Sequence, residues 1–229
     1  MNSPETKIVN GFSFVRHVVQ TYPEQEVINR SQSFYEWINQ RRTVRDFSDK
    51  PIPKEVMDHL ILTASTAPSG AHKQPWTFCV IENAEIKKKI REAAEQEEYE
   101  SYTGRMSDEW LEDIKALQTD WHKPFLEVAP YLIVVFKKAY DLKEDGSKGT
   151  NYYVSESVGL ACGFLLAAIH HAGLVALTHT PSPMNFLTKI LNRPENERPF
   201  LLIPVGYPAD ETFVPKLERK RLSDVITYY

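Results

Sequence analysis

Residues 66–78 read Thr-Ala-Pro-Ser-Gly-Ala-His-Lys-Gln-Pro-Trp-Thr-Phe, a run of small residues with a proline near each end. The run follows a segment with helical spacing of apolar residues and precedes an apolar segment of strand length. Ser69, Gly70 and Ala71 leave consecutive backbone N–H groups unshielded, and Gly70 can adopt a positive φ without steric cost. Such a surface suits an anion or a flat polar heterocycle. A plain helix-to-strand loop is the alternative interpretation.

The composition limits the class of protein. The 229 residues, 42% hydrophobic and 25% charged, suffice for one large domain. A net charge of −4 and a pI near 6.0 argue against a nucleic-acid partner. Cys79 and Cys162 lie in apolar segments without a CxxC spacing, which indicates a reducing compartment and no disulfide framework or metal site. The first 30 residues contain no apolar run typical of a signal peptide or anchor, so we expect a cytoplasmic protein that binds no membrane.

The apolar spacing predicts an α+β fold in a single domain, 1–229, with a central sheet flanked by helices. Helices are expected over 33–41, 54–65, 83–102, 107–122, 152–171 and 184–191. Asn83 and Ser107 are expected to cap the third and fourth of these helices, and Ser33 the first. Strands are expected over 76–82, 130–136, 173–178 and 200–206, with a polar loop at 141–149.

Several segments predict contact with another subunit. The helix over 152–171 is apolar on nearly every side and must therefore be covered on every side. One domain of this length rarely encloses a central helix completely, so we expect this helix to lie at a subunit interface. Residues 1–32 are interpreted as an N-terminal arm, and residues 209–229 as a C-terminal extension onto a neighbouring subunit.

Three groups of residues carry the chemistry that the sequence suggests: the arginines at 41–45, the loop at 66–71, and Thr178–Thr180 at a strand end. Neither GxxxxGK[ST] nor GxGxxG occurs, so no P-loop or Rossmann site is available. Arginine forks match phosphate, which is compatible with a mononucleotide such as FMN. The alternative is a solvated helix end. The charge-rich helices over 95–125 suit an active-site lid.

The chain resembles the FMN-dependent nitroreductase superfamily. The resemblance rests on Arg-Arg-Thr-Val-Arg-Asp-Phe at 41–47, the run at 66–78, and Ile-Pro-Val-Gly-Tyr-Pro at 203–208, and it extends from about Trp37 to Leu222. It implies a nitroreductase-like fold with a mixed sheet, and an intertwined homodimer with two FMN sites at the subunit interface. The positions that match flavin contacts are Arg41, Arg42, Thr43, Val44, Arg45, Pro68, Ser69, Thr178, His179, Thr180 and Arg219. Where the most similar branch has a threonine triplet, this chain has Thr-His-Thr, which leaves the contact of His179 open.

That branch removes halogen from halotyrosines, and the lid pattern resembles it through Glu98, Tyr102, Arg105-Met106, Trp110 and Lys123. The resemblance assigns Glu98 to the substrate ammonium group and Lys123 with Tyr102 to its carboxylate. It also places the phenolate oxygen of the substrate at the N–H of Ala71. The alternative for Glu98 is a solvated charge run.

The resemblance implies reductive dehalogenation of halotyrosines, from iodotyrosine to tyrosine plus iodide, by stepwise electron transfer from reduced FMN. Thr180 is the candidate residue at flavin N5, where a hydroxyl donor favours one-electron steps over hydride transfer. The sequence leaves two electron donors open. One is NAD(P)H, with NADP as the nicotinamide coenzyme, and the other is a separate reductase. A broad-specificity nitroreductase or flavin reductase is the first alternative, and a non-catalytic flavin-binding protein is the second.

Overall fold

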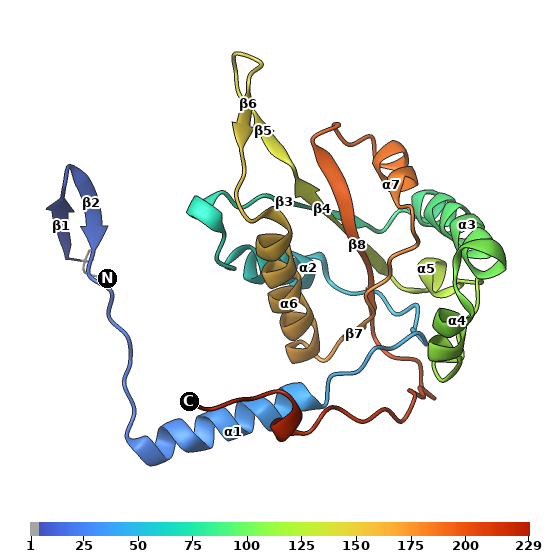
Figure 1. Cartoon of the computed structure of the whole chain (residues 1–229), viewed down its shortest axis with the longest axis horizontal. Helices are drawn as coiled ribbons and strands as arrows, with labels where there is room; N and C mark the ends of the chain where they lie inside the picture. The colour runs from blue at the N-terminus through green and yellow to red at the C-terminus, as the bar shows by residue number, and fades with distance from the viewer. Residues whose placement is uncertain (1–4) are drawn as a thin grey trace. The chain divides into compact units, whose positions relative to one another are not determined.

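The computed structural model describes residues 5–229, which divide at Arg41 into two units (Figure 1). In the first unit, β1 (Thr6–Val9) and β2 (Phe12–Val15) pair antiparallel. Asn10 and Gly11 make their turn with positive φ angles of 51° and 84°, as a two-residue hairpin requires. Helix α1 (Glu24–Asn39) follows.

The predicted helix start at Ser33 is wrong, because α1 begins directly after Pro23. The Ser33 hydroxyl donates to the carbonyl of Asn29 at 2.8 Å, inside the helix, so Ser33 is not its cap. The first turns of α1 have few apolar residues, and its stability does not come from a buried face, since none of its residues is buried. The prediction is wrong because it treats Ser33 as a cap, although Val27 and Ile28, seven residues before Phe34 and Tyr35, continue the apolar spacing toward the start of α1.

The second unit is built on a four-stranded sheet in the order β3-β4-β8-β7. Its strands are β3 (Trp76–Ile81), β4 (Tyr131–Lys138), β8 (Glu197–Gly206) and β7 (Val175–Ala176). These strands pair antiparallel, and a parallel bridge from Thr43 to Ala176 makes the sheet mixed. The four strands lie where the apolar runs predict them, although β7 is shorter than its run.

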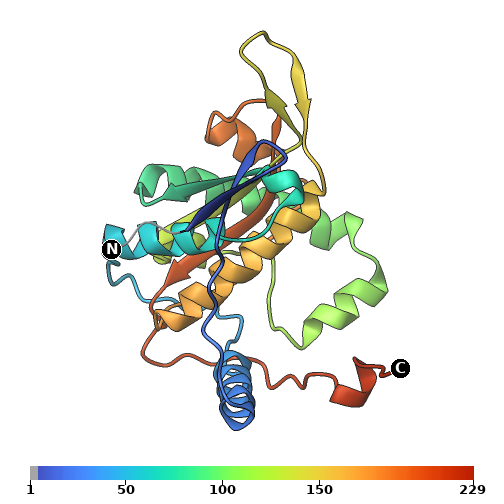
Figure 2. The ribbon, with the colours of Figure 1, turned by 90° about the vertical axis from the view of Figure 1, so that its left-hand side faces the viewer.

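Helices cover both faces of this sheet. One layer contains α2 (Lys54–Ser65) and α6 (Val154–His171), and the other contains α3 (Ala84–Glu100), α5 (Phe125–Val128) and α7 (Asn185–Ile190) (Figure 2). The central strand β4 serves both layers, because successive side chains of a strand point to opposite faces. Ile133 and Val135 pack with the first layer, and Leu132, Val134 and Phe136 pack with the second.

Two helix starts follow from capping side chains. The Asn83 side chain accepts from the N–H of Ile86 at 3.0 Å, and the Ser107 hydroxyl accepts from the N–H of Trp110 at 3.2 Å. Both predicted caps are confirmed. Between them, α3 ends in a π-helical turn, η2 (Ser101–Arg105), and α4 (Asp108–Lys115) is shorter than the predicted helix over 107–122.

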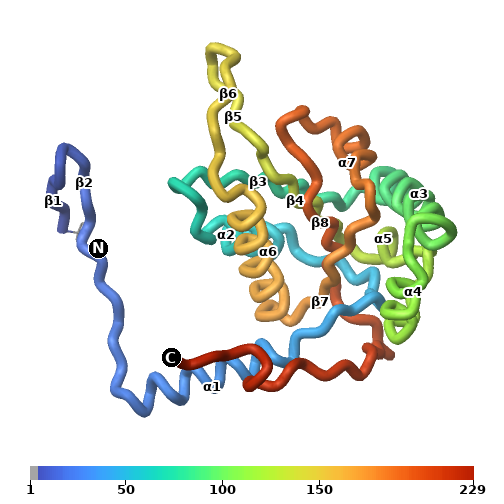
Figure 3. The backbone as a smooth tube through the Cα atoms, viewed as in Figure 1, coloured from blue at the N-terminus to red at the C-terminus, as the bar shows by residue number. Residues whose placement is uncertain are grey.

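The predicted polar loop at 141–149 is instead a hairpin. Its strands are β5 (Tyr140–Leu142) and β6 (Lys148–Thr150), and it projects from the rest of the second unit (Figure 3). Its turn residues are polar, so the sequence shows the turn but not the two short strands. A one-turn helix, η3 (Leu222–Asp224), lies in the C-terminal segment.

Helix α6 has one buried and one open face. Val158, Ala161, Cys162, Leu165 and Ile169 are buried in the core. On the open face, Leu160 and Phe164 are 49% and 40% exposed, and a Cβ added at Gly159 or Gly163 would meet nothing. By length and composition alone α6 could cross a membrane, but its buried face packs against the sheet as in a core helix.

The loop at 66–78 holds unusual backbone conformations. Gly70 does not adopt the positive φ that its sequence allows; Ala71, His72 and Gln74 do, at 49°, 55° and 47°. Gly70 is required for a different reason, because an added Cβ would lie 2.7 Å from the carbonyl oxygen of Tyr152. Left-handed conformations of residues with a Cβ cost free energy and tend to mark functional loops.

Substituting Gly70 tests this close approach. Gly70→Ala should lower the free energy of unfolding by about 1–3 kcal/mol, because the new methyl group overlaps backbone that cannot rotate away. Urea unfolding of the FMN-free protein measures it. Gly149→Ala is the matched control, since its nearest atom would be 3.5 Å away. Equal stability of the two variants would contradict the packing described here.

Candidate active site

A pocket of about 200 Å³ lies between two segments of the second unit. One is the lid segment, residues 95–125, and the other is the wall segment, residues 177–182. The predicted site residues that line the pocket are Arg45, Glu98, Tyr102, Lys123, Thr178, His179 and Thr180. They come from stretches far apart in the sequence, which the fold brings together on the α3 side of the sheet.

Glu98 and Lys123 form a buried ion pair inside the pocket. The Lys123 Nζ and Glu98 Oε2 atoms are 3.4 Å apart, and the two residues are only 3% and 9% exposed. Burial raises the pKa of Glu98, and the charge of Lys123 opposes this shift only in part. Burial likewise lowers the pKa of Lys123 against the attraction of Glu98. Lost hydration therefore outweighs mutual attraction for both partners.

Backbone and side-chain contacts hold both partners in place. Glu98 lies in the last turns of α3, and Lys123 directly precedes α5. The N–H of Lys123 donates to Glu95 Oε1 at 2.7 Å, and its Nζ donates to Thr119 Oγ1 at 3.3 Å and to the carbonyl of Asp120. The ammonium group is thus fixed from the lid side alone.

Tyr102 completes this cluster one helical turn after Glu98. Its hydroxyl donates to the carbonyl of Thr119 at 3.2 Å, and the Lys123 Nζ lies 5.6 Å from its ring centre. Burial raises the pKa of Tyr102, and the negative charge of Glu98 raises it further. Tyr102 therefore stays a phenol and can donate a hydrogen bond to an anionic ligand group.

The wall segment continues the sheet at His179. Its N–H and C=O pair with Leu202 at 2.8 and 3.0 Å, so neighbouring side chains alternate: Thr178 and Thr180 are exposed and His179 is buried. The imidazole packs edge-on against the ring of Phe125, with the ring centres 5.7 Å apart. Burial, with the charges of Lys123 and Arg45, lowers the pKa of His179 to about 3. Its buried Nε2 has no hydrogen-bond partner within residues 5–229.

The predicted arginine cluster is divided. Arg45 lines the pocket, and burial lowers its pKa. Arg42 donates to the carbonyl of Pro215. Val44 is buried, and its N–H donates to the carbonyl of Ala176 at 3.2 Å, while Thr43 forms the parallel bridge to the same residue.

Two predicted arginines lie outside the pocket lining. Arg41 ends the first unit, where its N–H donates to the carbonyl of Ile38 at 3.1 Å. Arg219 is exposed in the C-terminal segment. Their roles in phosphate binding stay predictions.

The small-residue loop does not line this pocket. The Gly70 N–H donates to Ser157 Oγ at 3.3 Å, and the Ser69 hydroxyl accepts from the N–H of Gln74 at 2.9 Å. The loop therefore packs at the start of α6, whereas the lid segment lies on the other face of the sheet (Figure 1). Pro68 and Ala71 are exposed there. In a single chain, the predicted site is thus in two parts.

The chain is similar to known proteins in sequence and in fold. The nitroreductase family profile matches residues 38–207. The chain is 63% identical to the iodotyrosine deiodinase of Haliscomenobacter hydrossis over 217 residues, 95% of this chain and 98% of that protein. It is 47% identical to the human iodotyrosine deiodinase 1 over 206 residues, covering 90% and 71% of the two chains.

The chain belongs to the nitroreductase family, in its iodotyrosine deiodinase branch. A crystal structure of an iodotyrosine deiodinase bound to FMN and 3-iodo-L-tyrosine has the same fold, with a TM-score of 0.72 and 33% identity over 86% of this chain and 98% of that one. The nitroreductase-like fold predicted from the sequence is confirmed.

Sequence reasoning missed part of the deiodinase-like pocket. Ile114 and Leu117 line it, although their helical spacing was typical of a core stripe. Thr119, Phe125 and Ser182 also line it, and no motif marked them. An apolar stripe on a charge-rich lid is a usable signal, because a lid over a ligand presents its apolar face to the pocket.

The neutral state of His179 predicts a pH dependence. Its folded pKa of about 3 lies below the usual value of 6.5, so its contribution to stability is complete above pH 6.5 and is lost as the pH falls toward 3. His179→Thr removes this contribution. The free energy of unfolding of the parent, minus that of the variant, should therefore fall by about 1.4 kcal/mol per pH unit below pH 6.5. Urea unfolding at several pH values measures it, and a pH-independent difference would show that the imidazole is not buried and neutral.

The ion pair predicts non-additive effects on stability. Lys123→Met leaves Glu98 buried without a cation and should cost about 3–5 kcal/mol, or less where the lid opens to water. The double variant Glu98→Leu/Lys123→Met should lie within about 1 kcal/mol of the parent or above it, because neither charge is then buried. Urea unfolding of the ligand-free protein measures this cycle.

The matched control is the exposed pair of Glu112 and Lys115 on α4, whose side chains are 70% and 67% exposed. Lys115→Met should change stability very little, since exposed pairs contribute at most about 1 kcal/mol. Additive effects of the Glu98 and Lys123 substitutions would mean that the two groups do not interact.

Proposed function

We propose that the protein is an FMN-dependent oxidoreductase that removes halogen from halotyrosines, converting iodotyrosine to tyrosine and iodide. The observation that carries this proposal is the buried pair of Glu98 and Lys123, with Tyr102 beside it. The family supports it, because the related crystal structure contains FMN and 3-iodo-L-tyrosine.

The buried pair matches the charges of an amino acid. A zwitterion brings one ammonium and one carboxylate, and it can replace the protein's own pair without leaving a charge unpaired. The substrate ammonium binds Glu98, and its carboxylate accepts from Lys123 and from the Tyr102 hydroxyl. Because hydration of Glu98 and Lys123 is already lost, the exchange adds little desolvation cost on the protein side.

FMN fits the polar groups of the wall segment. The buried Nε2 of His179 lacks a partner within residues 5–229, and a polar ligand edge there would remove the cost of an unsatisfied group. The exposed hydroxyls of Thr178 and Thr180 flank it. The remaining groups that would hold FMN are Arg42, Thr43, Val44, Arg45, Pro68, Ser69 and Arg219.

Reduced FMN, when bound, supplies the two electrons that, with one proton, replace a carbon–iodine bond by carbon–hydrogen and release iodide. The protein orients the substrate through Glu98 and Lys123, and Thr180 donates its hydroxyl toward the cofactor. The Ala71 N–H binds the phenolate oxygen of the substrate. The apolar side chains of the lid exclude water from the reacting ring.

The protein acts as a homodimer in this proposal. A pocket of about 200 Å³ is smaller than the 300–1,000 Å³ typical of sites for drug-sized ligands, so one chain does not enclose cofactor and substrate together. The loop with Pro68, Ser69 and Ala71 lies on the other face of the sheet and would complete the pocket of a second subunit. The open face of α6 provides an apolar surface for that contact.

Turnover with reduced cofactor tests the proposal. The purified protein should bind FMN, and after anaerobic reduction one equivalent of 3-iodotyrosine should reoxidise the flavin with release of tyrosine and iodide. Glu98→Gln should retain FMN and lose halotyrosine affinity by at least tenfold, because the ammonium group then lacks its anion. Absorbance and chromatography measure both steps. NAD(P)H and a flavin reductase can each be added as the donor.

The alternatives give different results. A broad nitroreductase or flavin reductase would reduce nitroaromatic compounds or free flavin equally well in the parent and in Glu98→Gln. A flavin-binding protein without turnover would leave the flavin reduced when 3-iodotyrosine is added. Unchanged halotyrosine affinity in Glu98→Gln would remove Glu98 from the site.

A further inference from the structure

The hydrogen bonds between the lid and wall segments converge on one backbone atom. The carbonyl oxygen of Ser182 accepts from Arg105 Nη1 at 3.0 Å and from Ser101 Oγ at 3.5 Å. Ser182 lies two residues after Thr180 on the wall segment, and Arg105 and Ser101 are the ends of the π-helical turn η2 on the lid segment. Within residues 5–229, these two hydrogen bonds connect the two sides of the pocket directly, although the Ser101 hydroxyl also donates to the carbonyl of Glu97 at 2.9 Å.

The lid side fixes the guanidinium group of Arg105. Its Nη1 donates to Glu97 Oε2 at 2.8 Å, and its Nη2 donates to Glu100. Both carboxylates belong to the last turns of α3, so Arg105 folds back along the helix that it follows. The Met106 N–H donates to the carbonyl of Ser101 at 2.9 Å and closes the wide turn. Such π turns are rare and occur frequently at functional sites.

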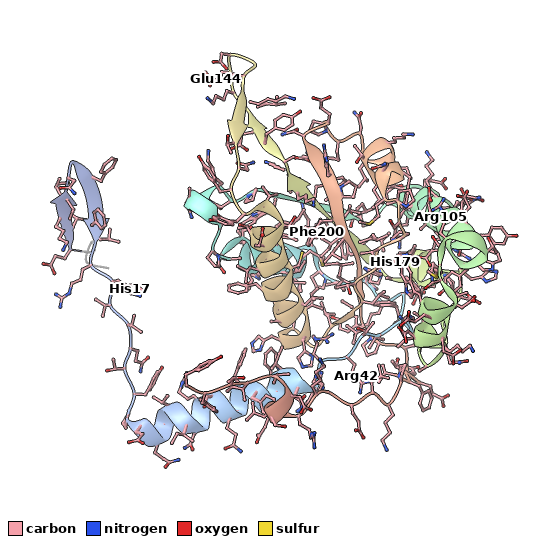
Figure 4. All side chains as sticks on the ribbon, in the orientation of Figure 1. His17, Arg42, Arg105, Glu144, His179 and Phe200 are labelled. Carbon is pink, nitrogen blue, oxygen red and sulfur yellow. The ribbon has the colours of Figure 1, made fainter. Side chains whose placement is uncertain are left out.

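A guanidinium group can hold these partners at the same time. It is planar and carries several N–H donors in a fixed fork, whereas a lysine ammonium is a point charge on a flexible stem. One edge of Arg105 faces the α3 carboxylates, and the same group reaches the Ser182 carbonyl. Figure 4 places Arg105 on the side of the sheet that also holds His179.

We propose that Arg105 is a positioning residue that latches the lid segment to the wall segment. The inference rests on the proposed function, since it assumes that the pocket binds a halotyrosine. Arg105 does not line the pocket and does not contact the substrate. It acts through Glu98 and Tyr102, which lie on the same helix-and-turn unit and take their place over Thr180 only while the latch is closed.

The contact between Arg105 and Ser182 explains how the exposed, charge-rich lid segment stays in place over a buried pocket. None of the residues of α4 is buried, so the lid segment is attached to the rest of the second unit chiefly at its two ends. Phe125 and Leu126 anchor the later end in the core. The earlier end turns away from the sheet at η2, and there the Arg105 contact to Ser182 closes it.

Binding and lid opening can be measured in the FMN-loaded protein. Arg105→Ala should raise the dissociation constant of 3-iodotyrosine about tenfold, the effect of losing one charge-assisted hydrogen bond, with no change in FMN content. Chymotrypsin should cut the ligand-free lid near Trp110 several-fold faster than in the parent. Equilibrium dialysis and timed digestion measure these changes without turnover.

Two further variants define the mechanism. Arg105→Lys keeps the charge without the fork and should behave like Arg105→Ala. Lys115→Ala removes an exposed pair from the same lid without touching the wall, so it should bind and digest like the parent. A normal far-UV spectrum and FMN content in each variant exclude misfolding as the cause.

The results separate the latch from the function on which it rests. The latch proposal is wrong if Arg105→Ala and Lys115→Ala have the same affinity for 3-iodotyrosine and the same digestion rate. It is also wrong if Arg105→Lys matches the parent in both. Loss of FMN in Arg105→Ala would also overturn it, because a general structural role would then suffice. If the parent fails to bind 3-iodotyrosine, the proposed function fails, while the digestion rates still decide the latch.

Discussion

The burial of Glu98 against Lys123 is the interaction on which the site depends. A carboxylate and an ammonium lose most of their hydration when they are buried as deeply as Glu98 and Lys123. Both pKa shifts follow burial and not attraction, which means that the pair is a cost to the ligand-free fold. In the proposed function, a zwitterionic ligand pairs with both groups and turns this cost into recognition.

The two sides of the pocket differ in rigidity, and that difference suits their roles. Two backbone hydrogen bonds between His179 and Leu202 attach the wall segment to the sheet. They fix the directions in which the side chains of Thr178 and Thr180 point. The lid segment is charge-rich and holds its ligand groups through its own backbone, at Thr119 and Asp120. A rigid wall can orient a cofactor, while a lid attached at few points can admit a substrate and close over it.

The sequence carries enough information for the sheet and for the lid cluster. Apolar runs of strand length locate β3, β4 and β8, and the four-residue spacing of Glu98 and Tyr102 predicts that the two side chains lie on one side of α3 and the turn η2 that follows it. Other features had no sequence signal. The role of Gly70 depends on the carbonyl of Tyr152, which is distant in sequence. The unpartnered Nε2 of His179 likewise appears only once the fold surrounds it.

Three local costs in the second unit have one explanation. Ala71, His72 and Gln74 adopt left-handed backbone, and α6 leaves Leu160 and Phe164 exposed beside two glycines. The Nε2 atom of His179 has no hydrogen-bond partner among residues 5–229. Each is unfavourable in a single chain without ligands, and a stable fold has little free energy to spare for all of them. Each also concerns a surface where the proposed dimer or cofactor would bind. In the proposed dimer, contacts from the second subunit and from FMN would offset the strain, the unsatisfied polar atom and the uncovered apolar face together.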